Sequence, residues 1–286
     1  METSPLAKRL SSRFVAGETL QQALAVAQRV AGEGLTVTLD HLGENVTSLE
    51  EAAVSRDECL EAMKALRAAG LEANVSIKLT QFGMDLDEAV CRDNVELLAK
   101  EAAANGGFVR VDMESSAYTE RTLRLVTELH ARHRAIGTVI QAYLYRSARD
   151  VADLCQRRIR VRLCKGAYLE SADVAFKSKA DVDANYVRLM KALLEAGTYP
   201  AIATHDEAIL DEARRFVAER KIGRDSFEFQ MLYGIRRDLQ RRLAAEGFRV
   251  RLYVPYGKAW YPYFMRRLAE RPANLVFLAR NFLRSG

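Results

Sequence analysis

The chain has 286 residues, of which 49% are hydrophobic and 28% charged, and its formal net charge is +5. This length and apolar content allow one domain with a large core, and no run of residues is apolar for long enough to span a bilayer. The four cysteines have no CxxC spacing and the first residues, METSPLAKRL, contain no signal-like stretch. We therefore expect a reduced, cytoplasmic protein without disulfides, structural zinc or another metal site.

Helical and strand periodicities alternate along the chain after a first helix in GETLQQALAVAQRVAGEG, which Thr19 is placed to cap. The expected strands share short runs of alternating character and lie at 35–40, 73–80, 107–113, 137–145, 158–168, 201–206, 227–232 and 248–257. The expected helices follow these strands at 57–69, 87–104, 119–133, from 147 onward, 183–195, 207–220, 236–245 and 263–271, with a last amphipathic stretch at 274–284.

Eight strand–helix alternations at these spacings predict a distorted (β/α)8 barrel of the TIM type. No GxGxxG follows the first strand, which disfavours a doubly wound sheet. No composition break suggests a second domain, so we expect one catalytic domain over 1–286. Residues 1–33 should form an amino-terminal helical extension, and a last helix should lie over the barrel mouth.

The strands carry a polar face where a helix-covered parallel sheet is normally apolar throughout. Ser76 and Lys78 alternate with apolar residues in ANVSIKLT, as do Arg110 and Asp112 in FVRVDM. Buried charge is costly unless it is paired or meets a ligand. The pattern therefore predicts a charged barrel interior, and cations outnumber anions in it, which favours an anionic ligand.

Active sites of such barrels lie at the carboxyl ends of the strands. Polar residues occupy this position along the whole chain, and we expect them to converge: Asp40, Lys78, Asp112, Gln141, Arg162, Lys165, His205, Gln230 and Tyr253. Arg110, Arg160, Arg249 and Arg251 should add to the inward set lower in the barrel.

Arg266 and Arg267 follow the last strand in the helical segment YPYFMRRL. Adjacent helical residues diverge by about 100°. Both side chains can therefore reach one ligand only if this helix lies across the barrel top, where they could grip a carboxylate. A solvated helix face remains the alternative.

Several long segments resemble those of the proline dehydrogenase family, flavoenzymes of proline catabolism, in its small monofunctional bacterial form. They are GETL with TLDHLGE, VSIKLTQFG, VRVDME, QAYLYR, VRLCKGAY, ATHD, FEFQMLYG and YVPYGKAWYPYFMRRLAERP. The resemblance covers the chain from about Arg13 to the last helix, and its motifs follow the order of the expected strands. It departs from the family in its short amino-terminal part, which bears on oligomerisation, and in Cys164 within the RLxKGAY pattern.

The resemblance implies a distorted barrel that holds noncovalent FAD above the strand ends. It further implies oxidation of L-proline to Δ1-pyrroline-5-carboxylate by hydride transfer to the flavin, with electrons passed to a membrane quinone. Peripheral contact with the inner face of the membrane and assembly into a homo-oligomer are both possible. The stretch 274–284 could be an interfacial helix at the membrane or could pack against the barrel wall.

The family's motifs also imply roles for individual residues. Asp112 and Arg162 would be catalytic, with Asp112 more suited to positioning a cation than to abstracting a proton. The proline pocket would be formed by Lys78, Leu232, Tyr253, Tyr263, Arg266 and Arg267. The cofactor would be bound by Met113, Gln141, Arg162, Lys165, Gly166, Ala167, Thr204, His205 and Gln230, and Tyr168 is a further candidate.

Two other functions are compatible with the residues alone. A Schiff-base aldolase could use Lys78 or Lys165 at the barrel mouth, which requires a lysine that loses its proton readily. A catalytically silent barrel could serve as a binding module. Nucleic-acid binding is disfavoured, because the aromatic residues cluster in YVPYGKAWYPY beside the expected pocket and not on a basic platform.

Overall fold

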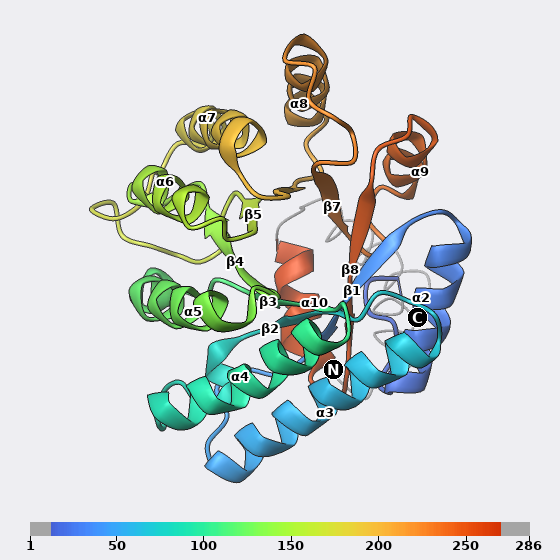
Figure 1. Cartoon of the computed structure of the whole chain (residues 1–286). Coiled ribbons are helices and arrows are strands. Elements are labelled where there is room, and N and C mark those ends of the chain that lie inside the picture. The colour runs from blue at the N-terminus through green and yellow to red at the C-terminus, as the bar shows by residue number, and fades with distance from the viewer. Residues whose placement is uncertain (1–12, 270–286) are drawn as a thin grey trace, which may run out of the picture.

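The computed structural model describes residues 13–269, with side chains described as far as residue 265. Eight parallel strands form a closed barrel in which each strand pairs with its neighbours in chain order and the first pairs with the last. Helices surround this barrel (Figure 1). The predicted (β/α)8 architecture is thereby confirmed.

The strands are short and are connected by longer helices. The strands are β1 (Thr36–His41), β2 (Asn74–Ile77), β3 (Phe108–Val111), β4 (Ile136–Gln141), β5 (Val161–Cys164), β6 (Ala201–Ala203), β7 (Glu228–Leu232) and β8 (Val250–Tyr256). The helices are α2 (Leu20–Gly32), α3 (Leu49–Ala68), α4 (Glu88–Ala104), α5 (Thr119–His133), α6 (Ser147–Gln156), α7 (Lys179–Ala196), α8 (Glu207–Glu219), α9 (Arg237–Ala245) and α10 (Trp260–Ala269), with 3₁₀ turns η1 (Leu79–Phe82) and η2 (Ser116–Tyr118).

Alternation along each strand separates two environments. Val109 and Val111 of β3 belong to the continuous apolar core between the sheet and the helices. The intervening Arg110 is only 3% exposed and donates to the backbone oxygens of Thr138 and Arg160. Burial, followed by the charge of Arg162, holds the pKa of Arg110 well below its usual range. The polar face predicted from the sequence therefore lies inside the barrel.

In a regular (β/α)8 barrel, the helix that follows β8 completes the outer ring of helices. Here α2 occupies that position beside the barrel. It contacts β1 and β8, and Figure 1 shows it between α9 and α3. Thr19 caps it as predicted. The Thr19 hydroxyl accepts from the backbone N–H of Gln22, and the side-chain oxygen of Gln22 accepts from the backbone N–H of Thr19. Val26 and Val30 bury the helix against the sheet.

Helix α10, displaced from that place, packs at the carboxyl ends of the strands. Trp260, Tyr263 and Phe264 form a buried cluster with Leu42, which follows β1, and with Val15. The helix is drawn across the ring of strands in Figure 1. This arrangement confirms the expected helix over the mouth and supplies the condition that Arg266 and Arg267 need to face one ligand.

Several sequence expectations differ from the structure. Helix α7 begins at Lys179 and not at residue 183, and β5 covers only Val161–Cys164 of the expected 158–168. Helix α3 begins at Leu49 and not at residue 57, because Ser48 caps it by accepting from the Glu51 amide. Helix α10 begins three residues before the expected Tyr263. Arg249 is not inside the barrel: it precedes β8, is exposed, and donates to the Tyr199 hydroxyl.

Candidate active site

Arg162 is the centre of the hydrogen-bonded network inside the barrel. Its guanidinium donates to Asp112 Oδ1 at 2.6 Å, to the Gln230 side-chain oxygen, and to Ser76 Oγ at 3.0 Å. These partners belong to three other strands or strand ends, so the bonds cross the barrel interior. The side chain is therefore held in one orientation by acceptors that engage Nε, Nη1 and Nη2 of its guanidinium.

Asp112 has both carboxylate oxygens engaged. Arg162 occupies Oδ1, and the Tyr253 hydroxyl donates to Oδ2 at 2.9 Å. Burial, and next the charge of Asp112, raises the pKa of Tyr253 well above its ordinary value, so this hydroxyl keeps its proton. Arg162 also lies over the Tyr253 ring, 5.3 Å from the centroid. Asp112 is thus arranged to position its neighbours.

Lys78 and Asp40 face each other at the ends of the first two strands. Lys78 Nζ lies 3.8 Å from Asp40 Oδ1, and the Asp40 carboxyl is fully buried. Within residues 13–265, neither oxygen of Asp40 accepts a hydrogen bond. Burial raises the pKa of Asp40, although the charge of Lys78 opposes the shift. The Asp40 carboxylate can therefore accept a hydrogen bond from a ligand or from Lys78.

The pKa of Lys78 is raised as well. Burial alone would lower it, but the charges of Asp40 and Asp112 outweigh burial. Lys78 therefore stays protonated and suits an anionic ligand. A Schiff-base lysine needs the opposite shift, which argues against the aldolase alternative for this residue.

A second ion pair closes the lower part of the barrel. Arg251 Nε donates to both oxygens of Glu228, at 2.9 and 3.0 Å, and Nη2 reaches Glu72. Burial opposes ionisation of Glu228, but the charge of Arg251 outweighs it and lowers the pKa of Glu228. The carboxylate is thus an acceptor at neutral pH, and Gln230 donates to it.

Gln141 presents an amide to the mouth from the end of β4. Its Nε2 donates to the backbone oxygens of Met113 and Glu114. Its Oε1 is buried and has no hydrogen-bond partner among the described side chains and backbone. Because Nε2 is held on the protein, the free oxygen can accept an N–H group of a ligand.

The segment after β5 approaches the same region by its backbone. Gly166 has φ of +112°, and a Cβ there would lie 2.3 Å from the Tyr143 ring. Glycine is therefore required by both conformation and packing. Ala167 is exposed. Lys165 pairs with Asp183 at 2.5 Å and Asp206 at 2.9 Å, beside the starts of α7 and α8.

Residues after β6 and β7 complete the rim. Leu232 is half-buried, and its backbone N–H donates to His205 Nε2 at 2.9 Å. A neutral His205 therefore carries its proton on Nδ1. Thr204 is buried and accepts from the Asp206 amide at 3.1 Å. Leu232 pairs in register with Tyr253, which packs against the cluster containing Tyr263.

The structure thus brings Lys78, Asp112, Arg162, Gln230 and Tyr253 into one cup inside the barrel. The backbone of Arg266 and Arg267 lies in α10, but their side chains fall outside the described part, as does the stretch 274–284.

Sequence reasoning gave Ser76, Glu114 and Glu228 no role in the site and named Asp40 only as one of the polar strand ends. The structure shows that they are buried and hydrogen-bonded or paired within it: Asp40, Ser76, Glu114 and Glu228. The alternation of polar and apolar residues along the strands could have identified them as inward-facing. Which residues they contact depends on the register of the barrel and could not be read from the sequence.

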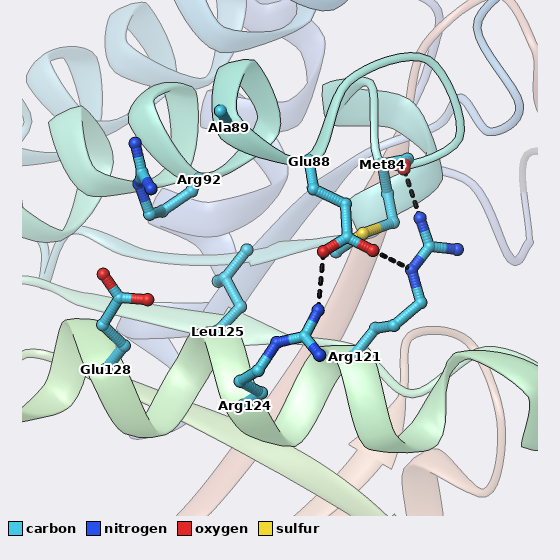
Figure 2. Close-up of a pocket in the computed structure, with 8 residues that line it drawn as sticks. All are labelled: Met84, Glu88, Ala89, Arg92, Arg121, Arg124, Leu125 and Glu128. Carbon is cyan, nitrogen blue, oxygen red and sulfur yellow. Dashed lines mark hydrogen bonds and ion pairs between the residues drawn. The ribbon is translucent and has the colours of Figure 1, made fainter.

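A separate surface pocket lies between α4 and α5 on the outer wall (Figure 2). Three of its charged side chains form ion pairs within it: Glu88 accepts from Arg121 at 2.5 Å and from Arg124 at 2.6 Å. None of the expected site residues lines it. We assign it no catalytic role.

In residues 13–269, no group of acidic, histidine and cysteine side chains could hold a metal ion. No helix in that range has the length and apolarity needed to cross a membrane.

Comparisons with known proteins agree with the geometry. The sequence profile described as "Proline dehydrogenase" matches residues 23–280. The chain is 46% identical over 282 residues to Proline dehydrogenase of Deinococcus radiodurans, covering 96% of this chain and 90% of that protein. It is 43% identical over 272 residues to Proline dehydrogenase 1 of Bacillus subtilis strain 168, covering 95% and 90%.

A solved structure extends the likeness to the fold. Proline utilization A (PutA) from Bdellovibrio bacteriovorus, inactivated by N-propargylglycine, superposes with a TM-score of 0.85 at 28% identity. The match covers 91% of this chain and 32% of that chain, so our chain spans about a third of the PutA polypeptide. The profile and the relatives settle the assignment: this chain belongs to the proline dehydrogenase family and oxidises proline, the first step of proline catabolism.

Proposed function

We propose that this barrel oxidises L-proline to Δ1-pyrroline-5-carboxylate with noncovalent FAD and passes the electrons to a membrane quinone. The observation that carries the proposal is the cup in which buried Lys78 and Arg162 both lie at strand ends, each beside a carboxylate, beneath a helix that contains two arginines. Lys78 and Arg162 are balanced there by Asp40 and Asp112, so the surplus positive charge that suits a small carboxylate ligand would come from the two arginines of the helix.

The proline carboxylate would be bound by Lys78, Arg266 and Arg267. Lys78 is protonated and lies at the mouth, and α10 runs over the same end of the barrel. The pyrrolidine ring would pack against side chains of the rim: Leu232, Tyr253 and Tyr263. Tyr253 and Tyr263 already share one cluster, which gives the ring an aromatic wall.

The residues present fit a flavin. Gln141 offers a buried acceptor oxygen, and Gly166 allows close backbone approach. The cofactor would be held by Met113, Gln141, Arg162, Lys165, Gly166, Ala167, Thr204, His205 and Gln230. When bound, FAD accepts the hydride that leaves the ring carbon next to the amine.

The chain's own groups prepare the substrate. Oxidation breaks a C–H bond on that carbon with its electron pair, removes a proton from nitrogen, and forms the C=N bond of the product. Asp112 would hold Arg162 and Tyr253 in place, since both its oxygens are occupied. Arg162 would stabilise the negative charge that develops during the transfer, an electrostatic contribution that needs no rearrangement.

We further propose that the enzyme is cytoplasmic and meets the quinone at the inner face of the membrane, with 274–284 as a candidate contact. Residues 1–286 would form one barrel domain with 1–33 as its amino-terminal extension. Co-sedimentation with liposomes, compared before and after deletion of 274–284, tests the membrane contact.

The visible spectrum of the purified protein tests the main proposal. We expect flavin absorbance that L-proline bleaches without oxygen, and a product that has lost two hydrogens. N-propargylglycine, which inactivated the Bdellovibrio PutA, should inactivate this protein, and proline should protect it. A colourless protein, or flavin that proline leaves oxidised, would instead support a silent barrel.

The carboxylate assignment has its own test in Arg266→Met. Loss of a desolvated charge pair should raise KM by a factor equivalent to roughly 2–5 kcal/mol. Arg132→Met is the matched control, since Arg132 is 46% exposed and pairs with Glu96 on the outer wall. A change below about threefold in KM for Arg266→Met would contradict the assignment.

A further inference from the structure

A buried chain of hydrogen bonds leads from the lower ion pair to Arg162. Gln230 Nε2 donates to Glu228 Oε1, and Gln230 Oε1 accepts from Arg162 Nε. Glu228 is 2% exposed, Gln230 4% and Arg162 6%. Water therefore cannot easily substitute for any of these bonds.

The direction of this chain follows from the chemistry of its first member. An ionised carboxylate can only accept hydrogen bonds, whereas an amide side chain can turn either end toward a neighbour. Glu228 is held ionised by Arg251, which is itself fixed by the backbone oxygen of Val37 at 2.7 Å. Gln230 must therefore turn its NH₂ group toward Glu228. Its oxygen is then left to face Arg162.

The opposite amide orientation would fail at both ends. It would place the Gln230 oxygen against the Glu228 carboxylate and the NH₂ group against the Arg162 N–H groups. Two acceptors and two donors would then face each other without water, at a cost of several kcal/mol. Glu228 thus selects one state of the amide.

We propose that Glu228 is a positioning residue for proline oxidation, acting through the Gln230 amide to hold the Arg162 guanidinium at the cup. The role of Arg162 beside the flavin rests on the function proposed above. Glu228 itself would touch neither substrate nor cofactor, since its oxygens are engaged by Arg251 and Gln230. Its influence should appear in the rate of hydride transfer and not in the binding of proline, whose carboxylate meets other cations.

Gln230→Met breaks the chain while leaving the Glu228–Arg251 pair intact. Losing a hydrogen bond to a charged group corresponds to about 10-fold or more in rate, so kcat should fall about that far while KM changes by less than about threefold. The midpoint potential of the bound flavin should become more negative in Gln230→Met, and also in Glu228→Gln, which leaves Gln230 and any contact that it makes with the cofactor in place.

The double variant with Glu228→Gln decides whether Glu228 acts through Gln230. Alone, Glu228→Gln should lower kcat about 10-fold. In the Gln230→Met background it should lower kcat by less than about twofold, because the hydrogen bonds that connect Glu228 to Arg162 are already lost. Glu228→Gln should also lower the free energy of unfolding, because Arg251 loses the charge of its partner. This loss of stability should be equal in the wild-type and Gln230→Met backgrounds. Should Glu228→Gln fail to fold, Glu228→Asp keeps a charge for Arg251 and withdraws it from Gln230.

Glu72→Gln is the matched control. Glu72 also pairs with Arg251 but is 37% exposed, and its other oxygen accepts from the Asn74 side chain. It should leave kcat and the flavin potential unchanged. Equal losses of kcat from Glu228→Gln in both backgrounds, or an unchanged potential and kcat in Gln230→Met, would overturn the proposal. A wild-type protein without flavin would instead overturn the proposed function.

Discussion

The Lys78–Asp40 pair offers a quantitative test of the charged cup. The two charges are 3.8 Å apart, and the Asp40 carboxyl is completely buried. With an effective dielectric constant of about 20, the attraction between unit charges at this separation is about 4 kcal/mol. Lys78→Met removes this attraction and leaves a carboxylate without its cation.

We expect Lys78→Met to lower the free energy of unfolding by about 3–5 kcal/mol near neutral pH. The Lys78→Met/Asp40→Asn double variant should recover most of this loss, since no uncompensated charge is then buried. Lys191→Met is the control: its Nζ lies 2.6 Å from Glu212, but the pair is partly exposed, so its loss should stay at or below about 1 kcal/mol.

The stability deficit of Lys78→Met should depend on pH in a definite direction. Burial raises the pKa of Asp40, and removing Lys78 takes away a charge that lowers it. A group whose pKa is raised by folding contributes stability below its unfolded pKa and loses it as pH rises through the folded pKa. The deficit of Lys78→Met should thus be larger near pH 8 than near pH 5. Urea unfolding at both pH values measures it, and a deficit that is the same at both, or that the double variant leaves unchanged, would refute the reasoning.

Three further predictions concern other parts of the barrel. Gly166→Ala should cost about 1–3 kcal/mol through strain and overlap with the Tyr143 ring, and should weaken flavin binding. Gly106→Ala, at φ of +67° with nothing within 4 Å, should cost less in thermal unfolding. Burial lowers the pKa of His130, so stability should be greatest above the ordinary value of about 6.5 and fall as the pH drops below it, a slope that His130→Gln removes. Asp112→Asn should reduce kcat by weakening the hold on its guanidinium partner; a variant with nearly full activity would exclude Asp112 as the base.

The sequence allowed the barrel to be predicted because the polar and apolar faces of its strands alternate. Val109, Arg110 and Val111 fall on the two sides of the sheet as their period of two requires. Alternation does not show where a strand begins, however. Arg249 continues the pattern of β8 but lies before its first residue, at the exposed rim.

Which polar residues would meet was not predictable in the same way. Ser76 and Arg162 are separated by 86 residues and lie on strands that are not neighbours, so their contact follows from closure of the barrel. Asp40 was recognisable as a strand end but not as a fully buried carboxyl. The position of α2 beside β8, which leaves α10 free to lie over the mouth, also depends on tertiary packing.

The barrel interior carries repulsion between two buried guanidinium groups. Arg110 has its pKa lowered by burial and by Arg162, so the two guanidinium groups destabilise each other within the fold. Asp112 and Glu228 compensate them only in part, because each carboxylate also serves a second partner, Tyr253 or Arg251. An anion that arrives at the mouth therefore relieves repulsion that the folded chain already carries. Under the proposed function, charge stabilisation during proline oxidation would then be built in before the substrate binds, which is the arrangement that electrostatic catalysis requires.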